Sequence, residues 1–321
     1  MTLDHYKQLF LQHLSQKTEK KQPNNLYDPI DYILNLGGKR LRPILVLMSC
    51  DLFGGKSTQA LDAALAIEMF HNFTLIHDDI MDSAPLRRGE KTVHKKWNEN
   101  TAILSGDALM ILAYKMFDSY NADTYKPLLQ LFNQTALEVC EGQQYDMDFE
   151  TQNEVSLNQY LKMISYKTSV LIAAAIKMGA IIAKADESDA DNIYNFGLNL
   201  GVAFQLQDDY LDVFADADFG KQKAGDIIKN KKTFLFIKCL ELANDEDKKR
   251  LLNLYGKNQN SDTKIDEVTA LFNKYEIPKV LQNDIERYTH EALKYVQNLF
   301  VSDNKKEILK TFSEDLMSRT I

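Results

Sequence analysis

Apolar residues recur with helical spacing along nearly the whole chain. In one segment after another they return every three or four positions, and few segments show the period of two that marks a strand. Short polar breaks containing Gly, Pro, Asn or Asp, the residues of turns, separate these segments. The pattern predicts helices over residues 3–14, 28–36, 43–52, 58–81, 101–120, 126–149, 156–185, 188–214, 233–243, 245–255, 264–275 and 277–301.

Composition agrees with a single helical domain. Among 321 residues, 45% of them hydrophobic, Gly (13) and Pro (6) are scarce, and no Gly/Ser-rich or Pro-rich linker divides the chain. The longest stretch without helical periodicity, residues 215–232, is rich in Lys and Asp, and a loop of that length is usually functional or mobile. We therefore expect one all-α domain over residues 1–321.

Charge and cysteine usage narrow the class of partner. A formal net charge of −8 argues against a broad nucleic-acid surface, which needs clustered Lys and Arg. The amino terminus is amphipathic and lacks the apolar core of a signal peptide, and the three cysteines lie too far apart in sequence to suggest a disulfide framework. The most apolar span, residues 169–183, is interrupted by Lys177 and is shorter than the ~20 residues that cross a bilayer. We expect a cytoplasmic protein with no membrane span.

Aspartates are concentrated at the ends of two predicted apolar helices. In "LIHDDIMDSAPLRRG", residues 75–89, Asp78 and Asp82 are one helical turn apart on one face, with Asp79 at its edge. Like charges at this spacing repel each other unless water or divalent cations separate them. One such motif is most often a solvated helix face. The same spacing returns in "FQLQDDYLD", residues 204–212, and this second copy favours a metal-binding function for both.

Basic residues occur in four clusters before and after these aspartates. Arg holds phosphate through a bidentate fork and Lys as a point charge, so the clusters suit an anionic ligand, although each alone could be a surface loop. The clusters are "GGKRLRP" (Lys39, Arg40, Arg42), "LRRG" (Arg87, Arg88), "YKTS" (Lys167, Thr168) and "GKQKAGDIIKNKKT" (Lys221, Lys223, Lys231, Lys232).

These motifs, together with "EGQQYDMDF", resemble those of the trans-isoprenyl diphosphate synthases in their order and spacing over residues 28–240. The resemblance implies an all-α fold, an antiparallel helix barrel around a deep central cavity, and usually a homodimer. It also implies Mg²⁺ as the cofactor, three ions per active site with Mn²⁺ as a substitute. The partners it implies are isopentenyl diphosphate and an allylic diphosphate (dimethylallyl, geranyl or farnesyl).

The resemblance also implies a role for each charged residue. It assigns the metal ions to Asp78, Asp82 and Asp208, with Asp79, Asp209 and Asp212 as supporting ligands. It assigns the allylic diphosphate to Arg87, Lys167, Lys221 and Lys231, and isopentenyl diphosphate to Lys39, Arg42, His71 and Arg88. Metal-assisted loss of diphosphate would leave an allylic cation, steadied by Gln205 and by the carbonyls of Lys167 and Thr168, which the double bond of isopentenyl diphosphate attacks head to tail. The loop 215–232 would close the site against water.

Product length should depend on the residues below the first aspartates. Phe73 and Thr74 lie five and four residues before Asp78, about 6–8 Å deeper along the helix. In the family, aromatic residues at this level form a floor, and an aromatic only at the deeper position is common among C20 producers. With Phe73 aromatic, Thr74 small, Phe70 one turn further down and no two-residue insertion in the motif, we expect C20 over C15, and C25 or longer less often. Alternatively, Phe73 and Phe70 only pack between helices.

Two rival functions have sequence features that can be checked. A terpene cyclase would replace the second aspartate motif, and a non-catalytic partner subunit would lose aspartates, whereas all six are present. One departure from the family pattern is Asn230, which stands where the family usually has Gly, although Asn also tolerates positive φ. The stretch "TAILSGDALMILAY", residues 101–114, is a candidate dimer face, and Arg319 is the only basic residue that the tail could place over the site.

Overall fold

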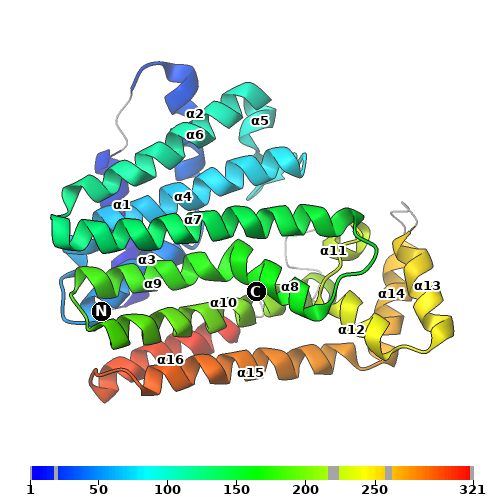
Figure 1. Ribbon diagram of the computed structural model, residues 1–321. Coiled ribbons are helices and arrows are strands. Elements are labelled where there is room, and N and C mark those ends of the chain that lie inside the picture. The colour runs from blue at the N-terminus through cyan, green and yellow to red at the C-terminus, as the bar shows by residue number, and fades with distance from the viewer. Residues whose placement is uncertain (1, 18–20, 216–223, 257–261, 319–321) are drawn as a thin grey trace. The chain divides into compact units, whose positions relative to one another are not determined.

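The chain is almost entirely helical. The computed structural model describes residues 2–17, 21–215, 224–256 and 262–318. Within these ranges the only strands are β1 (Leu86–Arg87) and β2 (Glu90–Lys91), which pair as one antiparallel hairpin. The expectation of an all-α fold is confirmed (Figure 1).

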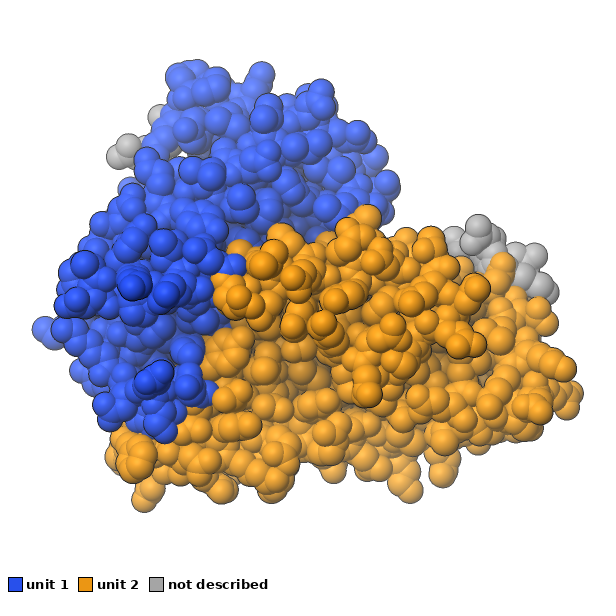
Figure 2. Space-filling model, in the orientation of Figure 1, with its two compact units in different colours: residues 1–133, 174–191 blue, residues 134–173, 192–321 orange. Residues whose placement is uncertain are grey.

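The helices group into two compact units, which Figure 2 colours separately. Unit 1 comprises residues 1–133 and 174–191, and unit 2 comprises residues 134–173 and 192–321. The boundaries between the units fall inside α7 (Ala122–Thr151), α9 (Val170–Ile182) and α10 (Glu187–Phe214). The expected single domain over residues 1–321 stays a prediction.

Unit 1 is built around one largely buried helix. It contains α1 (Leu3–Lys17), α2 (Asn24–Asn35), α3 (Leu41–Leu52), the 3₁₀ turn η1 (Ser57–Ala60), α4 (Leu61–Met81), α5 (Val93–Lys96), α6 (Glu99–Lys115) and the 3₁₀ turn η2 (Met116–Ser119). Residues 63–70 of α4 are all buried, and all of them except Glu68 are apolar, so this helix forms the centre of the unit. It packs against α3 and α6.

Unit 2 has a large aliphatic and aromatic core. It contains α8 (Leu157–Ile164), the π-helical turn η3 (Ser165–Ser169), most of α10, then α11 (Gly225–Ile228), α12 (Phe234–Leu242), α13 (Asp245–Tyr255), α14 (Asp262–Lys274), α15 (Ile277–Gln297) and α16 (Asp303–Met317). Local sequence fixes several helix starts. Ser156 and Gln159 form a reciprocal capping box at α8, and Asn244 accepts a hydrogen bond from the Asp247 amide at α13.

Three local features differ from the sequence-based expectation. The predicted helix over residues 156–185 is interrupted by the π-helical turn η3, and the predicted loop over residues 215–232 contains the short helix α11. No helix was predicted after residue 301, yet α16 occupies residues 303–317. Most residues of α16 are polar or charged, and its few apolar residues form a narrow buried stripe of Leu309, Phe312 and Leu316.

One apolar stretch is long enough to cross a membrane by length and composition. It runs from Leu157 to Ile182, through α8, η3 and α9, and 67% of its most apolar window is buried inside the protein. A buried core helix passes the same test, so this stretch is weak evidence for a membrane span.

Candidate active site

The first aspartate motif lies at the C-terminal end of α4. Asp78 is half-buried, Asp82 is exposed, and Asp79 is 1% exposed because its carboxylate turns toward the hairpin that follows. Arg87 on β1 grips Asp79 with a fork, Nε to Oδ2 at 2.8 Å and Nη2 to Oδ1 at 2.7 Å. Burial opposes the Arg87 charge, but this hydrogen bond and the neighbouring aspartates raise the pKa of Arg87. Arg87 therefore holds the motif in place.

A second group of cations forms beside α4. Arg42 Nη1 donates to Nε2 of His71 at 3.2 Å. Burial, and then the guanidinium charges of Arg42 and Arg88, lower the pKa of His71 well below its usual value, so the ring is neutral and accepts this bond. Burial also lowers the pKa of Arg42 to about 10. Cations that lie close together repel one another, and burial removes their hydration. An anionic ligand bound here would offset both of these free-energy costs.

The glycines of "GGKRLRP" shape the approach of Arg88. Gly37 and Gly38 adopt φ of 80° and 113°, and Arg88 donates to the Gly37 carbonyl. A Cβ on Gly38 would lie 2.8 Å from Cζ of Arg88, so only glycine leaves room for the guanidinium there. Lys39 beside them is exposed.

Arg40 has a different role from its neighbours in the same motif. Its guanidinium is buried in an ion pair with Glu68 and donates to the Leu34 carbonyl. Asn72 also donates to Glu68 Oε1 at 3.2 Å. This ion pair offsets the burial of the Glu68 carboxylate, whose charge also opposes the lowering of the pKa values of Arg42 and Arg88.

The residues below the first motif form an aromatic layer. The Phe73 ring contacts the rings of Phe70 and His77, with centroids 5.6 Å and 4.7 Å apart. Phe70 packs further on Phe132 at 5.2 Å. Thr74 is half-buried, and its hydroxyl donates to the His71 carbonyl at 2.8 Å. Packing of Phe70 between helices is thus observed, and Phe73 lies at the edge of that packing, nearer the aspartates.

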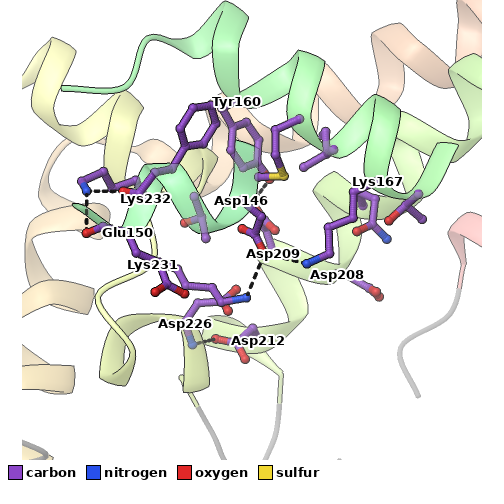
Figure 3. Close-up of a pocket in the computed structure, with 16 residues that line it drawn as sticks. Asp146, Glu150, Tyr160, Lys167, Asp208, Asp209, Asp212, Asp226, Lys231 and Lys232 are labelled. Atoms are coloured by element: carbon purple, nitrogen blue, oxygen red, sulfur yellow. Dashed lines mark hydrogen bonds and ion pairs between the residues drawn. The ribbon is translucent and has the colours of Figure 1, made fainter. Parts of the chain in front are cut away.

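The second aspartate motif opens onto a cavity of about 240 Å³ inside unit 2. Figure 3 shows its charged side chains arranged around one space, contributed by α7, η3, α10, α11 and the segment before α12. Seven residues to which the sequence assigned a role line it, namely Lys167, Thr168, Gln205, Asp208, Asp209, Asp212 and Lys231. Residues far apart in sequence therefore converge here.

The π-helical turn gives Lys167 and Thr168 an unusual backbone. The Val170 amide donates to the Ser165 carbonyl five residues back, which shifts the hydrogen-bond register by one residue. Such a shift leaves a carbonyl of the turn without its helical partner, and π-turns are frequent at functional sites. A Cβ on Gly142 would lie 2.2 Å from the Lys167 amide nitrogen, so α7 approaches this turn as closely as backbones allow.

Two aspartates of the second motif are already engaged by protein donors. Asp209 accepts hydrogen bonds from the Tyr160 hydroxyl and from the Phe234 amide, the latter at 3.3 Å. Burial and the nearby Asp226 raise the pKa of Asp209. Asp212 Oδ2 accepts from the Asp226 amide at 3.0 Å. Asp79 and Asp209, the middle aspartates of the two motifs, thus both bind protein groups, whereas Asp208 is exposed.

Asp146 and Asp226 are acidic residues of this cavity that the sequence did not single out. Asp146 receives the Lys167 ammonium at 2.6 Å, and the Lys231 ammonium lies 3.9 Å from the same oxygen. Burial opposes ionisation of Asp146, but the two lysines outweigh it and lower its pKa. Burial and Asp212 raise the pKa of Asp226 to about 6. Both residues stand inside the motifs "EGQQYDMDF" and "GKQKAGDIIKNKKT", which was the available signal.

Two further lining residues had weaker signals. Tyr160 precedes Lys167 by seven residues, two helical turns along one face, but it could not be told from a packed aromatic. Lys232 donates to the carbonyls of Phe149 and Glu150 at the end of α7, so this lysine caps a helix. Lys221, Lys223, Arg319 and residues 216–223 of the expected lid lie outside the described residues.

The donor set suits a hard divalent cation. Among the residues that the structure describes, no three His, Cys, Asp or Glu side chains stand close enough to hold a metal ion by themselves. Mg²⁺ takes only one or two carboxylates in phosphate sites and completes its shell with water and phosphate oxygens. Asp78 and Asp82 close α4, and Asp208 and Asp212 lie near the end of α10. Both pairs of aspartates lie at the C-terminal end of their helix, where the helix dipole disfavours anions. A cation bound there would therefore be stabilising.

Comparison with known proteins agrees with this chemistry. The family model described as polyprenyl synthetase matches residues 23–272. The chain is 38% identical over 273 residues to the geranylgeranyl diphosphate synthase of Sulfolobus acidocaldarius, covering 84% of this chain and 82% of that protein. It is also 38% identical over 245 residues to the geranylfarnesyl diphosphate synthase of Natronomonas pharaonis, covering 69% and 71%. A crystal structure of a geranylgeranyl pyrophosphate synthase is 48% identical, covers 99% of both chains and superposes with a TM-score of 0.96.

Proposed function

The chain belongs to the polyprenyl synthetase family, and we propose that it joins an allylic diphosphate to isopentenyl diphosphate, head to tail, as a short-chain trans-prenyltransferase. The main product is the C20 geranylgeranyl diphosphate, in keeping with the names of several relatives. One observation carries this reading: two lysines and the second aspartate motif converge on a single cavity, as binding of a metal-bound diphosphate requires.

Both aspartate motifs bind Mg²⁺, and the whole chain acts as one functional domain in this proposal. Asp78, Asp82 and Asp208 hold Mg²⁺, with Asp79, Asp209 and Asp212 in support. Support for unequal roles comes from the contacts of Asp79 and Asp209, whose carboxylates already bind protein donors. When bound, Mg²⁺ neutralises the diphosphate and makes it a leaving group. Mn²⁺ substitutes for it.

Different groups of basic residues bind the two substrates. Lys167 and Lys231 bind the allylic diphosphate together with Arg87 and Lys221, and they exchange their contact with Asp146 for the ligand. Isopentenyl diphosphate binds to Lys39, Arg42, His71 and Arg88. The neutral His71 ring and the guanidinium of Arg42 are already hydrogen-bonded to each other, which supports placing them in one subsite.

The π-helical turn stabilises the allylic cation. A carbonyl released at Lys167 or Thr168 points its dipole at positive charge, and Gln205 adds a neutral amide oxygen. The proton lost after condensation goes to the departing diphosphate, which serves as the base. The loop over residues 215–232 excludes water that would otherwise capture the cation.

The assembly and location follow from the same reading. A homodimer forms through α6, where Leu104 and Ile111 are 61% and 55% exposed. These residues lie two turns apart on one face of the stretch that the sequence singled out. We propose the cytoplasm as the location, which agrees with three free cysteines and a mostly buried apolar helix.

One assay tests the proposed function. The purified protein is incubated with Mg²⁺, isopentenyl diphosphate and dimethylallyl diphosphate, and diphosphate release is followed before the dephosphorylated products are chromatographed. We expect release that depends on Mg²⁺ and a C20 alcohol as the main product. Absence of diphosphate release would refute the synthase, and a product that is only C15 or mainly C25 would refute the chain length.

A further inference from the structure

Asn230 forms the turn that places Lys231 at the cavity. Its φ is 56°, in the left-handed region that Asn tolerates better than most residues. The Asn230 amide donates to the Ile227 carbonyl at 3.2 Å, and the Lys231 amide donates to the Asp226 carbonyl at 2.9 Å. These two bonds form a Schellman motif at the end of α11. The backbone of Asn230 therefore sets the direction in which Lys231 leaves the helix.

A buried lysine from another helix holds the Asn230 side chain. Lys264, in the first turn of α14, is 4% exposed and donates to Asn230 Oδ1 at 2.6 Å. Its ammonium also lies 5.5 Å from the centre of the Tyr255 ring. A lysine in the first turn opposes the helix dipole, and burial strips its hydration. An apolar residue would fill this position without the unfavourable dipole interaction and without the loss of hydration. The charge at residue 264 is therefore not explained by packing alone.

The other end of this connection is the diphosphate subsite. The Lys231 ammonium lies 3.9 Å from Asp146 Oδ2 and lines the cavity with Lys167 (Figure 3). A lysine side chain has several rotatable bonds, so its use as a fixed charge depends on a fixed backbone. The Schellman turn supplies that backbone, and Lys264 secures the turn from outside the cavity.

We propose that Lys264 is a positioning residue for the allylic diphosphate, acting through Asn230 to fix Lys231. The proposal rests on the assignment of Lys231 to that substrate. Lys264 does not itself line the cavity, whose wall includes Lys231 but not α14. Loss of the contact loosens the turn and weakens binding of one substrate, while the isopentenyl diphosphate subsite of unit 1 keeps all its described contacts.

The test uses two single variants and their combination. Asn230→Gly keeps the left-handed backbone and removes the amide, whereas Lys264→Met keeps an unbranched side chain over Tyr255 and removes the charge. We expect each to raise the KM for the allylic diphosphate about threefold to tenfold, the loss typical of one charge-assisted hydrogen bond. The KM for isopentenyl diphosphate should not change, and the double variant should resemble either single variant because both remove the same contact.

Lys274→Met is the matched control. Lys274 is on the same helix and also lies 5.5 Å from a tyrosine ring, that of Tyr275, but among the described residues its ion pair is with Asp247 and not with the Lys231 turn. Its KM values should equal those of the unchanged protein. Amide hydrogen exchange over residues 226–232 gives a readout apart from turnover. Exchange at the Lys231 amide should accelerate in Asn230→Gly and Lys264→Met only.

The possible outcomes separate this inference from the proposed function. Unchanged KM values in Asn230→Gly and Lys264→Met would overturn the role of Lys264 while leaving the synthase intact. Equal rises for both substrates would also overturn it, since they would indicate general loosening of the fold. If the unchanged protein releases no diphosphate, the proposed function fails and the substrate role fails with it, whatever the exchange data show.

Discussion

Phe73 lies between the aspartates of α4 and the aromatic layer beneath them. Its ring is buried, and it contacts His77 on the side of the motif and Phe70 on the other. Thr74, the adjacent position, carries a small side chain that bonds to its own helix. A growing product that descends along α4 would therefore meet Phe73 as its first large obstacle.

Phe73→Ala should lengthen the product. Removing the ring opens the level about 7–8 Å below Asp78, and chains of C25 and longer should replace part of the C20 product. A buried Phe→Ala change costs about 3–5 kcal/mol of stability, so the assay is run well below the melting temperature. Chromatography of the dephosphorylated products measures the effect, and an unchanged distribution would place the floor elsewhere.

Phe117→Ala provides the comparison for this experiment. Phe117 is fully buried in the same aromatic layer, with its ring 5.1 Å from that of Phe132, but it belongs to η2 and not to α4. Its loss should lower the melting temperature by a similar amount without altering product length. Equal lengthening in both variants would indicate general loosening of the layer.

At the scale of elements, the functional backbone of unit 2 depends on close packing around η3. Gly142 of α7 approaches the Lys167 amide, and Gly201 of α10 approaches Ser169, where a Cβ would lie 2.7 Å from the serine Cβ. The turn therefore packs against two glycines, and a side chain introduced at either position would displace it. This packing holds Lys167 and Thr168 at the cavity wall.

Gly142→Ala should reduce kcat more than tenfold. The added methyl group would clash with the Lys167 amide at 2.2 Å, and overpacking of this kind costs about 1–3 kcal/mol and shifts backbone. Gly179→Ala is the control, because a Cβ there would lie 2.3 Å from the Val46 carbonyl in unit 1. Both variants should melt earlier by similar amounts. Equal loss of kcat in the two would contradict a special role for the π-helical turn.

Helical periodicity predicted the long elements of this fold well, for a physical reason. Helices such as α4 and α10 bury a wide apolar surface, so their spacing is visible in sequence. The π-turn was not predicted, because helical periodicity does not register a single-residue shift and the contact of this turn with Gly142 comes from a distant segment. The helix α16 was missed because its buried stripe is narrow and its surface is highly charged.

The candidate site was predictable where charge repeated a pattern. Duplicate aspartate motifs identified Asp208, Asp209 and Asp212, and the structure places all three at one cavity. Sequence could not distinguish which aspartate binds protein donors, since that depends on Arg87 and Tyr160. Nor could it separate Arg40, which is buried against Glu68, from its neighbours in the same motif.

The whole molecule combines a strongly acidic balance with local cationic sites. A net charge of −8 would repel diphosphates at long range, but screening limits that repulsion to about 8–10 Å at physiological salt. Close contacts therefore decide binding, and Arg42, Lys167 and Lys231 are each partly withdrawn from water. Raised salt should consequently affect KM less than it would for a binder that relies on surface charge.

Exposed apolar residues on α6 allow the oligomeric state of the protein to be tested. Leu104 and Ile111 are large, exposed and two turns apart, which is unusual for a solvated helix. Leu104→Glu combined with Ile111→Glu should convert a dimer to a monomer, because each carboxylate would be buried without a partner at the interface. Light scattering after size-exclusion chromatography measures the mass. Leu252→Glu, at a site on α13 that is 49% exposed, should leave the dimer intact, and a dimer that survives both α6 changes would place the interface on another surface.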